Sequence, residues 1–178
     1  MTAKECITGR RSIRQFKSNS IDHDLIAEIV AEAAYAPSWK NTQIARYIAV
    51  EGDLKAKVAE CTSAHPNNGR MINEAPMVIA VAVKTGRCGF ERDGSFTTDR
   101  GDSWQMFDAG VAASTFCLAA YEHGLGTVIL GIFDHKEAAK VLGLPDDMDL
   151  VTLIPIGYPN EAPAAPKRKE VEELLSFQ

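Results

Sequence analysis

Three arginines and one serine lie within five residues near the start of the chain, at Arg10, Arg11, Ser12 and Arg14. A guanidinium group is permanently charged and binds an oxyanion through paired N–H donors, and a serine hydroxyl adds a short donor. The cluster is therefore suited to a phosphorylated ligand. A second interpretation stays open on the residues alone, because cations also favour the C-terminal end of a helix and residues 7–9 have that character.

A second polar segment follows a helix and a proline, with the sequence Pro37-Ser38-Trp39-Lys40-Asn41-Thr42-Gln43. Amide, hydroxyl and ammonium groups in this combination can hydrogen-bond the edge of a heterocycle. The alternatives are an ordinary loop after a helix and, for Trp39, an anchor in the core or at a subunit interface.

Composition limits the class of protein. With 178 residues and 46% hydrophobic content, we expect one domain over residues 1–178 with one substantial core. The formal net charge of -5 argues against a general nucleic-acid binder, so we expect the arginine cluster to bind one small anion. The cysteines and histidines lack the spacing of a metal site, and no segment resembles a signal peptide or a membrane span. We therefore expect no metal, no membrane association and a reducing, cytoplasmic location.

Periodic apolar residues predict the elements that position these segments. A helix begins after Asp22 and ends before Pro37, a strand covers residues 46–51, and Asp53 caps a helix that runs to about residue 64. A buried strand follows at 77–83, and the polar loop 85–102 is expected near a substrate opening. The later elements are a core helix at 107–121, a strand at 127–133, a helix after Asp134 and a strand at 151–156. The prolines after residue 158 predict an extended tail with a short amphipathic end.

Four motifs occur in an order that resembles the FMN-dependent nitroreductase family over nearly the whole chain. They are Arg10-Arg11-Ser12-Ile13-Arg14, then Ala36-Pro37-Ser38 with Asn41 and Gln43, then Gly124-Leu125-Gly126-Thr127 leading to Leu130-Gly131, and Ile154-Pro155-Ile156-Gly157-Tyr158-Pro159. The resemblance implies an α+β, three-layer fold with a central, mostly antiparallel sheet flanked by helices. It also implies a homodimer with FMN at the subunit interface and residues 159–178 as a C-terminal arm.

The resemblance also assigns residues. It implies that Arg10 and Ser12 hold the FMN phosphate with Arg11 nearby, that Arg14 approaches the pyrimidine edge, and that the tail adds a second clamp. The tail residues are Arg168 and Lys169. The other cofactor-binding positions are Pro37, Ser38, Trp39, Asn41 and Gln43 from the partner subunit, Asn68 at the pyrimidine edge, and Leu130 and Gly131, whose turn presents a backbone N–H toward flavin N5.

The implied activity is ping-pong transfer of a hydride from NADH or NADPH through flavin N5 to a nitroaromatic, quinone or similar acceptor. Alignment and a fixed cation near the reduced ring suffice for this chemistry, so we expect no catalytic acid or base. The sequence departs from the family pattern at two places. Ile44-Ala45 follow Gln43 where many members have proline and an aromatic residue, which concerns specificity. No lysine lies near residues 68–71, where larger members place one against the pyrimidine ring, so the resemblance leaves that charge to Arg14 alone. The alternatives are a specialised flavin enzyme of the same fold, such as a dehalogenase, a flavin-destroying oxygenase or a metabolite dehydrogenase, and a non-catalytic flavin- or nucleotide-sensing module.

Overall fold

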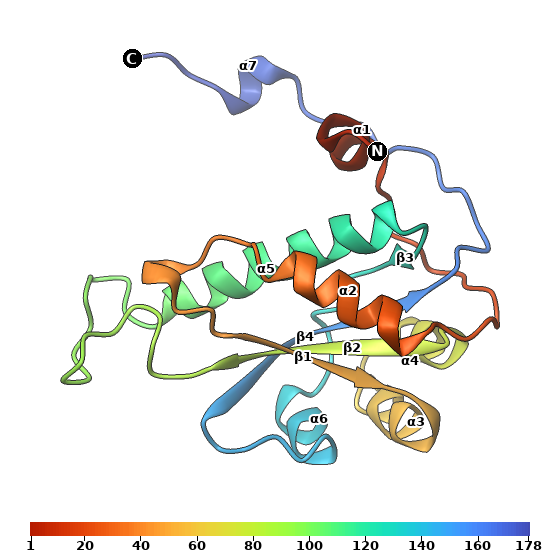
Figure 1. Cartoon of the computed structure of the whole chain (residues 1–178), viewed down its shortest axis with the longest axis horizontal. Coiled ribbons are helices and arrows are strands. Elements are labelled where there is room, and N and C mark those ends of the chain that lie inside the picture. The colour runs from red at the N-terminus through yellow and green to blue at the C-terminus, as the bar shows by residue number, and fades with distance from the viewer.

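A four-stranded antiparallel sheet forms the centre of the protein in the computed structural model, which describes residues 1–178 (Figure 1). The strand order is β1-β2-β4-β3, and every neighbouring pair is antiparallel. The strands are β1 (Ala45–Val50), β2 (Met77–Lys84), β3 (Gly126–Thr127) and β4 (Met148–Gly157). The predicted α+β class with an antiparallel sheet is confirmed.

Helices cover both faces of this sheet, which makes the predicted three layers. Met77, Ile79 and Val81 of β2 pack into one core cluster, whereas Val78 and Ala80 pack into the other, as alternation along a strand requires. The first face is covered by α2 (His23–Ala33) and α5 (Ser103–Glu122), and the second by α3 (Gly52–Glu60), α4 (Pro66–Glu74) and α6 (His135–Val141).

Most predicted elements are present, but the helix after β1 is capped differently. Glu51, and not Asp53, is the N-cap of α3, and its side chain makes no capping hydrogen bond. The predicted helix also ends early, at Glu60, and α4 was not predicted. Pro66 at the start of α4 carries the signal for it, since proline lacks the N–H that a first-turn residue leaves unused.

The predicted strand over residues 127–133 is wrong beyond Thr127. Strand β3 pairs with β4 through Gly126 and Thr127, after which the partner strand presents Pro155. Proline has no N–H, so the ladder is interrupted there, and only an isolated bridge forms further on, between Leu130 and Leu153. The residues after Leu130 are consequently released into a turn.

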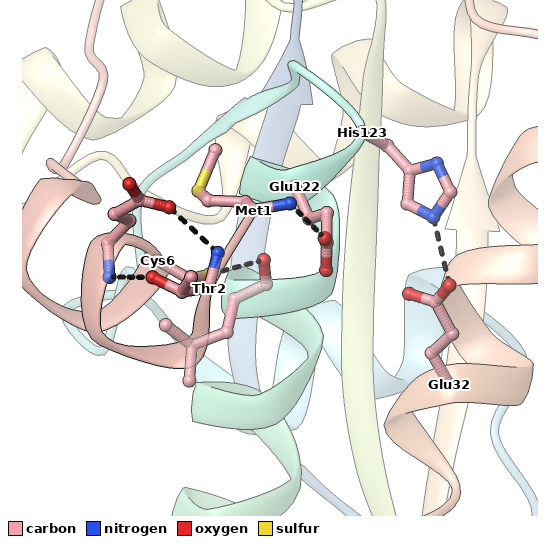
Figure 2. A network of polar contacts seen from close by, with 8 residues as sticks. Met1, Thr2, Cys6, Glu32, Glu122 and His123 are labelled. Atoms are coloured by element: carbon pink, nitrogen blue, oxygen red, sulfur yellow. Dashed lines mark hydrogen bonds and ion pairs between the residues drawn. The ribbon is translucent and has the colours of Figure 1, made fainter.

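Helix α1 (Ala3–Gly9) is fixed against the C-terminal end of α5 (Figure 2). The N-terminal ammonium of Met1 pairs with Glu122 at 3.0 Å, and the Cys6 thiol donates to the carbonyl of Leu118 at 3.3 Å. At the same end of α5, His123 contacts Glu32 of α2 at 3.1 Å. These contacts set the position at which α1 ends and the arginine segment begins.

The tail leaves β4 and runs back past the N-terminal helix (Figure 1). It ends in the short helix α7 (Val171–Leu174), whose residues are all exposed. No helix of the protein combines the length and the apolarity that crossing a bilayer requires.

We expect Gly126→Ala to destabilise the protein by about 1–3 kcal/mol, because overpacking a tight contact has that cost. A Cβ at residue 126 would lie 2.6 Å from Cγ1 of Ile13. Gly131→Ala is the matched control, since its Cβ would meet no atom within 4 Å, and its change should stay within about 0.5 kcal/mol. Urea unfolding measures both, and equal midpoints would contradict this account of the contact.

Candidate functional site

The arginine cluster and the tail form one small cavity of about 120 Å³. Its volume corresponds to about four water molecules at about 30 Å³ each, which suits a compact oxyanion. The residues that line it are Arg10, Arg11, Ser12, Arg14, Pro163, Ala164, Pro166 and Arg168. Residues from the two ends of the chain are thereby brought together. Lys169 does not line the cavity and pairs with Glu173 at 3.7 Å.

The backbone next to β3 holds the arginine segment in place. Ser12 forms a parallel bridge with Thr127, and the N–H of Ile13 donates to the carbonyl of Thr127 at 2.9 Å. The Ile13 side chain packs directly on Gly126, where a larger residue would not fit. The absence of a Cβ at Gly126 therefore determines how closely the segment approaches the sheet.

No carboxylate neutralises the guanidinium groups of this cavity. None of the ion pairs in the structure includes Arg10, Arg11, Arg14 or Arg168. Arg11 donates to the carbonyls of Thr8 and of its neighbour at 2.8 and 2.7 Å, so the interpretation as a helix-end cation is confirmed for this one residue. Unpaired cations around one small cavity are the donor set that an anion such as phosphate requires.

The second polar segment adopts a strained conformation. It contains a short 3-10 helix, η1 (Trp39–Asn41), and three of its residues have positive φ: Lys40 at 45°, Asn41 at 55° and Gln43 at 47°. Each costs roughly 1–2 kcal/mol for a residue that carries a Cβ. Such a loop persists only where its surroundings hold it.

Asp108 of α5 is the main support of this loop. Its two carboxylate oxygens accept from the backbone N–H of Trp39 at 2.9 and 3.2 Å, although the residue is only 5% exposed. Within the loop, Oγ of Ser38 accepts from the N–H of Gln43 at 3.1 Å. At the tip, Lys40 pairs with Glu91 at 3.0 Å, which ties the loop to the segment 85–102.

A larger cavity of about 360 Å³ lies between this loop, α2, β1 and α5. Pro37, Ser38 and Gln43 line it, and Asp108 forms part of its wall. It shares no lining residue with the arginine cavity. Beside it, the indole N–H of Trp39 is buried without an acceptor, an arrangement that costs free energy unless another group supplies one. One copy of the chain thus keeps the two predicted halves of the site apart.

The third predicted part is the turn after the isolated bridge. Leu130 is not available to a ligand there, because its N–H donates to Leu153 at 2.8 Å, whereas Gly131 has no acceptor for its own N–H. The side chain of Asn68, which is buried, donates to the carbonyl of Ile132 at 3.0 Å. His135 contacts the carbonyl of Gly131 at 3.3 Å. Both side chains hold the turn in position.

The long loop 85–102 is attached to the rest of the site. The indole N–H of Trp104 donates to Thr98 at 2.8 Å, and its ring lies 4.8 Å from the ring of Trp39. Hydrogen bonds and the charge of Lys40 lower the pKa of the Glu91 carboxyl. Burial, and secondarily the nearby Asp108, raises the pKa of the Cys88 thiol to about 12. That thiol therefore stays protonated at neutral pH and is a poor nucleophile.

Two residues of this site, Asp108 and His135, were not predicted from the sequence. Asp108 interrupts an otherwise apolar helix, which is the one signal that marked it, because a buried carboxylate needs a donor nearby. His135 gave no signal, since its contacts with Gly131 and with the carbonyl of Leu150 follow from the path of the chain.

Comparison with known proteins shows which family this chain is similar to. A family model described as the nitroreductase family matches residues 7–158. A protein of Methanothermobacter thermautotrophicus, provisionally named NADH dehydrogenase/NAD(P)H nitroreductase, is 26% identical over 92% of this chain and 80% of its own length. An iodotyrosine deiodinase of Haliscomenobacter hydrossis is 27% identical over 93% of this chain and 84% of its own. The structure of an FMN and NADPH-dependent nitroreductase of Sphigopyxis sp. strain HMH superposes with a TM-score of 0.82 at 20% identity, covering 100% of this chain and 99% of that one.

We expect Asp108→Ala to lower the free energy of unfolding by about 1–3 kcal/mol, because the buried N–H of Trp39 loses its acceptor. Asp108→Asn retains one acceptor oxygen and should cost less. Asp99→Ala, which removes an exposed acid that accepts no hydrogen bond, is the control for loss of charge. Urea unfolding ranks the three variants, and an Asp108→Ala protein as stable as Asp99→Ala would refute the supporting role.

Proposed function

The chain belongs to the nitroreductase family, and on that premise we propose that it is an FMN-dependent oxidoreductase with NADH or NADPH as donor. The acceptor in this proposal is a nitroaromatic, a quinone or a similar small molecule, and donor and acceptor use the site in turn. One observation carries the proposal: four arginines without carboxylate partners line a single cavity of oxyanion size.

That cavity fits the phosphate of FMN and is too small for the rest of the molecule. Arg10, Arg14 and Arg168 supply charge, and Ser12 supplies a hydroxyl donor. Because Arg14 lines this cavity, we propose that it contributes to phosphate binding, in place of the role at the pyrimidine edge that the family resemblance implies. When bound, FMN supplies a ring system that accepts a hydride and passes the electrons to a second substrate.

The turn at Gly131 is the part of this chain that we assign to the ring. The N–H of Gly131 is free to donate, and its missing Cβ permits close approach by a planar group. Asn68 and His135 keep the turn from moving through their contacts with its carbonyls. Their contribution is orientation, which is the main requirement of hydride transfer.

Neither Tyr47 nor Cys88 is suited to act as a general base. Burial raises the pKa of Tyr47 and of Cys88 to about 12, so both stay protonated at neutral pH. This agrees with a site that positions its substrates and does not abstract protons. All four cysteines are free thiols, which supports a reducing, cytoplasmic setting.

We further propose a homodimer, with the loop at residues 37–43 completing the partner's site. The exposed face of α5 carries Met106 and Phe107, and Phe107 is 61% exposed. Gly110 and Ser114 follow on the same face at helical spacing, so a second copy could approach closely. The apolar end of the tail is also exposed, with Phe177 at 91%. Such surfaces are typical of an interface.

The deiodinase relative favours one second candidate, reductive dehalogenation on the same scaffold. Both reactions need the same phosphate cavity and differ only in the acceptor. Rates with a nitroaromatic and with a halogenated phenol under one donor concentration distinguish them, and the faster acceptor identifies the class.

We expect the purified protein, loaded with FMN, to be yellow and to bleach when NADH or NADPH is added without oxygen. Sedimentation of the same sample should give twice the mass of the 19.3 kDa chain. Absorbance spectra and equilibrium sedimentation check these two results. A protein that is colourless after incubation with FMN and removal of the free flavin would refute the oxidoreductase. It would leave the sensing module, provided that the protein binds another nucleotide.

Arg10→Ala should weaken FMN binding by about ten- to a hundredfold, because one charged hydrogen-bonding partner contributes about 1.5–3 kcal/mol. Its melting temperature without flavin should not fall, since the Arg10 side chain makes no ion pair and its loss removes one of four like charges around the cavity. Lys167→Ala is the control, as this exposed cation does not line the cavity. Quenching of flavin fluorescence measures affinity, and stoichiometric FMN at unchanged affinity in Arg10→Ala would refute the assignment.

A further inference from the structure

Glu161 is the last polar attachment between the tail and the rest of the chain. After it, residues 162–178 form hydrogen bonds and ion pairs only among themselves, and no residue from 162 onward is buried. Yet Pro163, Ala164, Pro166 and Arg168 make one wall of the arginine cavity. The position of that wall therefore depends on the attachment just before it.

The attachment continues a short antiparallel ladder. The N–H of Lys17 donates to Tyr158 at 2.9 Å, and the N–H of Asn160 donates to Gln15 at 3.0 Å. The next donors on the arginine side are the backbone N–H groups of Arg14 and Gln15, which have no backbone acceptor. Oε1 of Glu161 accepts from both, at 2.5 and 3.2 Å.

A side chain takes part there because the backbone ladder stops at Asn160. Pro163 and Pro166, which have no N–H and a fixed φ, further limit strand pairing by the tail beyond it. The Glu161 carboxylate accepts from N–H groups that have no backbone acceptor, and it thereby joins the tail to the segment that carries Arg14.

The carboxylate of Glu161 forms no ion pair with an arginine, although Glu161 and Arg11 both line a second cavity beside the arginine cavity. Glu161 does not line the arginine cavity itself. Because its oxygen is occupied by two N–H donors, the guanidinium groups remain available to an anion. A carboxylate that served to neutralise them would contact them instead.

We propose that Glu161 is a positioning residue that closes the phosphate cavity, and that it thereby sets the preference of the site for FMN over riboflavin. The inference rests on the proposed FMN binding. The isoalloxazine contacts lie elsewhere, at the Gly131 turn and the loop at residues 37–43, so loss of Glu161 affects the phosphate contacts selectively. Riboflavin, which lacks the phosphate, reports on those other contacts alone.

The test compares dissociation constants for FMN and riboflavin, measured by fluorescence quenching, in the full-length protein and its variants. Glu161→Ala should weaken FMN by about ten- to a hundredfold, because it removes two hydrogen bonds to a charged acceptor, and should change riboflavin by less than about twofold. Glu161→Gln keeps an acceptor oxygen and should restore most of the preference. Glu172→Ala, an exposed tail acid without contacts, should leave both constants unchanged.

Glu161→Asp covers the case in which the alanine variant does not fold, since it keeps the charge but withdraws the oxygen by one methylene. Its FMN to riboflavin preference should fall as well. Equal weakening of both flavins, or an unchanged preference, in a folded variant would overturn the proposal. A wild-type protein that binds neither flavin would instead refute the proposed function, and the two failures are thereby distinguishable.

Discussion

Repulsion among four guanidinium groups is the constraint around which this end of the molecule is organised. Like charges around a small cavity raise the free energy of the unliganded fold, and the increase is larger where water is partly excluded. The structure withstands this because the backbone of the arginine segment is attached on two sides. Thr127 holds it toward the sheet and Glu161 holds it toward the tail. An anion that enters relieves the repulsion, so affinity follows from the arrangement.

The loop at residues 37–43 shows the same relation between local cost and external support. Its positive φ angles are unfavourable in isolation, and the polar groups of Asp108 and Ser38 compensate for them. The indole N–H of Trp39 is buried without an acceptor, so contacts within one chain do not satisfy every polar group of this loop. A second copy, or a bound group, would complete it.

Helix α5 links the two regions mechanically. Its buried face packs on the sheet, its first half carries Asp108, and its last turn receives α1 through Leu118 and Glu122. A displacement of this helix would therefore move the strained loop and the arginine segment together. Its exposed apolar face is the surface that we assign to the dimer, so association and cofactor binding would act on one rigid element.

The residue pattern of the sequence was enough to predict the course of most helices and strands and the position of the arginine cluster, whereas the α+β class followed from the family resemblance. The predicted elements and the arginine cluster depend on near neighbours: periodicity identifies faces, and Arg10, Arg11, Ser12 and Arg14 are close in the chain wherever it folds. The strand predicted over residues 127–133 was wrong beyond Thr127 because its partner strand presents Pro155. This cause depends on which strands pair, and residues 127–133 alone do not show it.

The contacts that hold the site in place depend on the packing of elements that are distant in the chain. Asp108 reaches Trp39 across 69 residues, and Glu161 reaches Arg14 across 147. An aspartate in a helix and a glutamate in a proline-rich tail look like ordinary polar residues until the packing of the sheet brings their acceptor oxygens to unpaired N–H groups. Local propensity cannot encode such contacts, because their geometry comes from the summed packing of elements far apart in the chain.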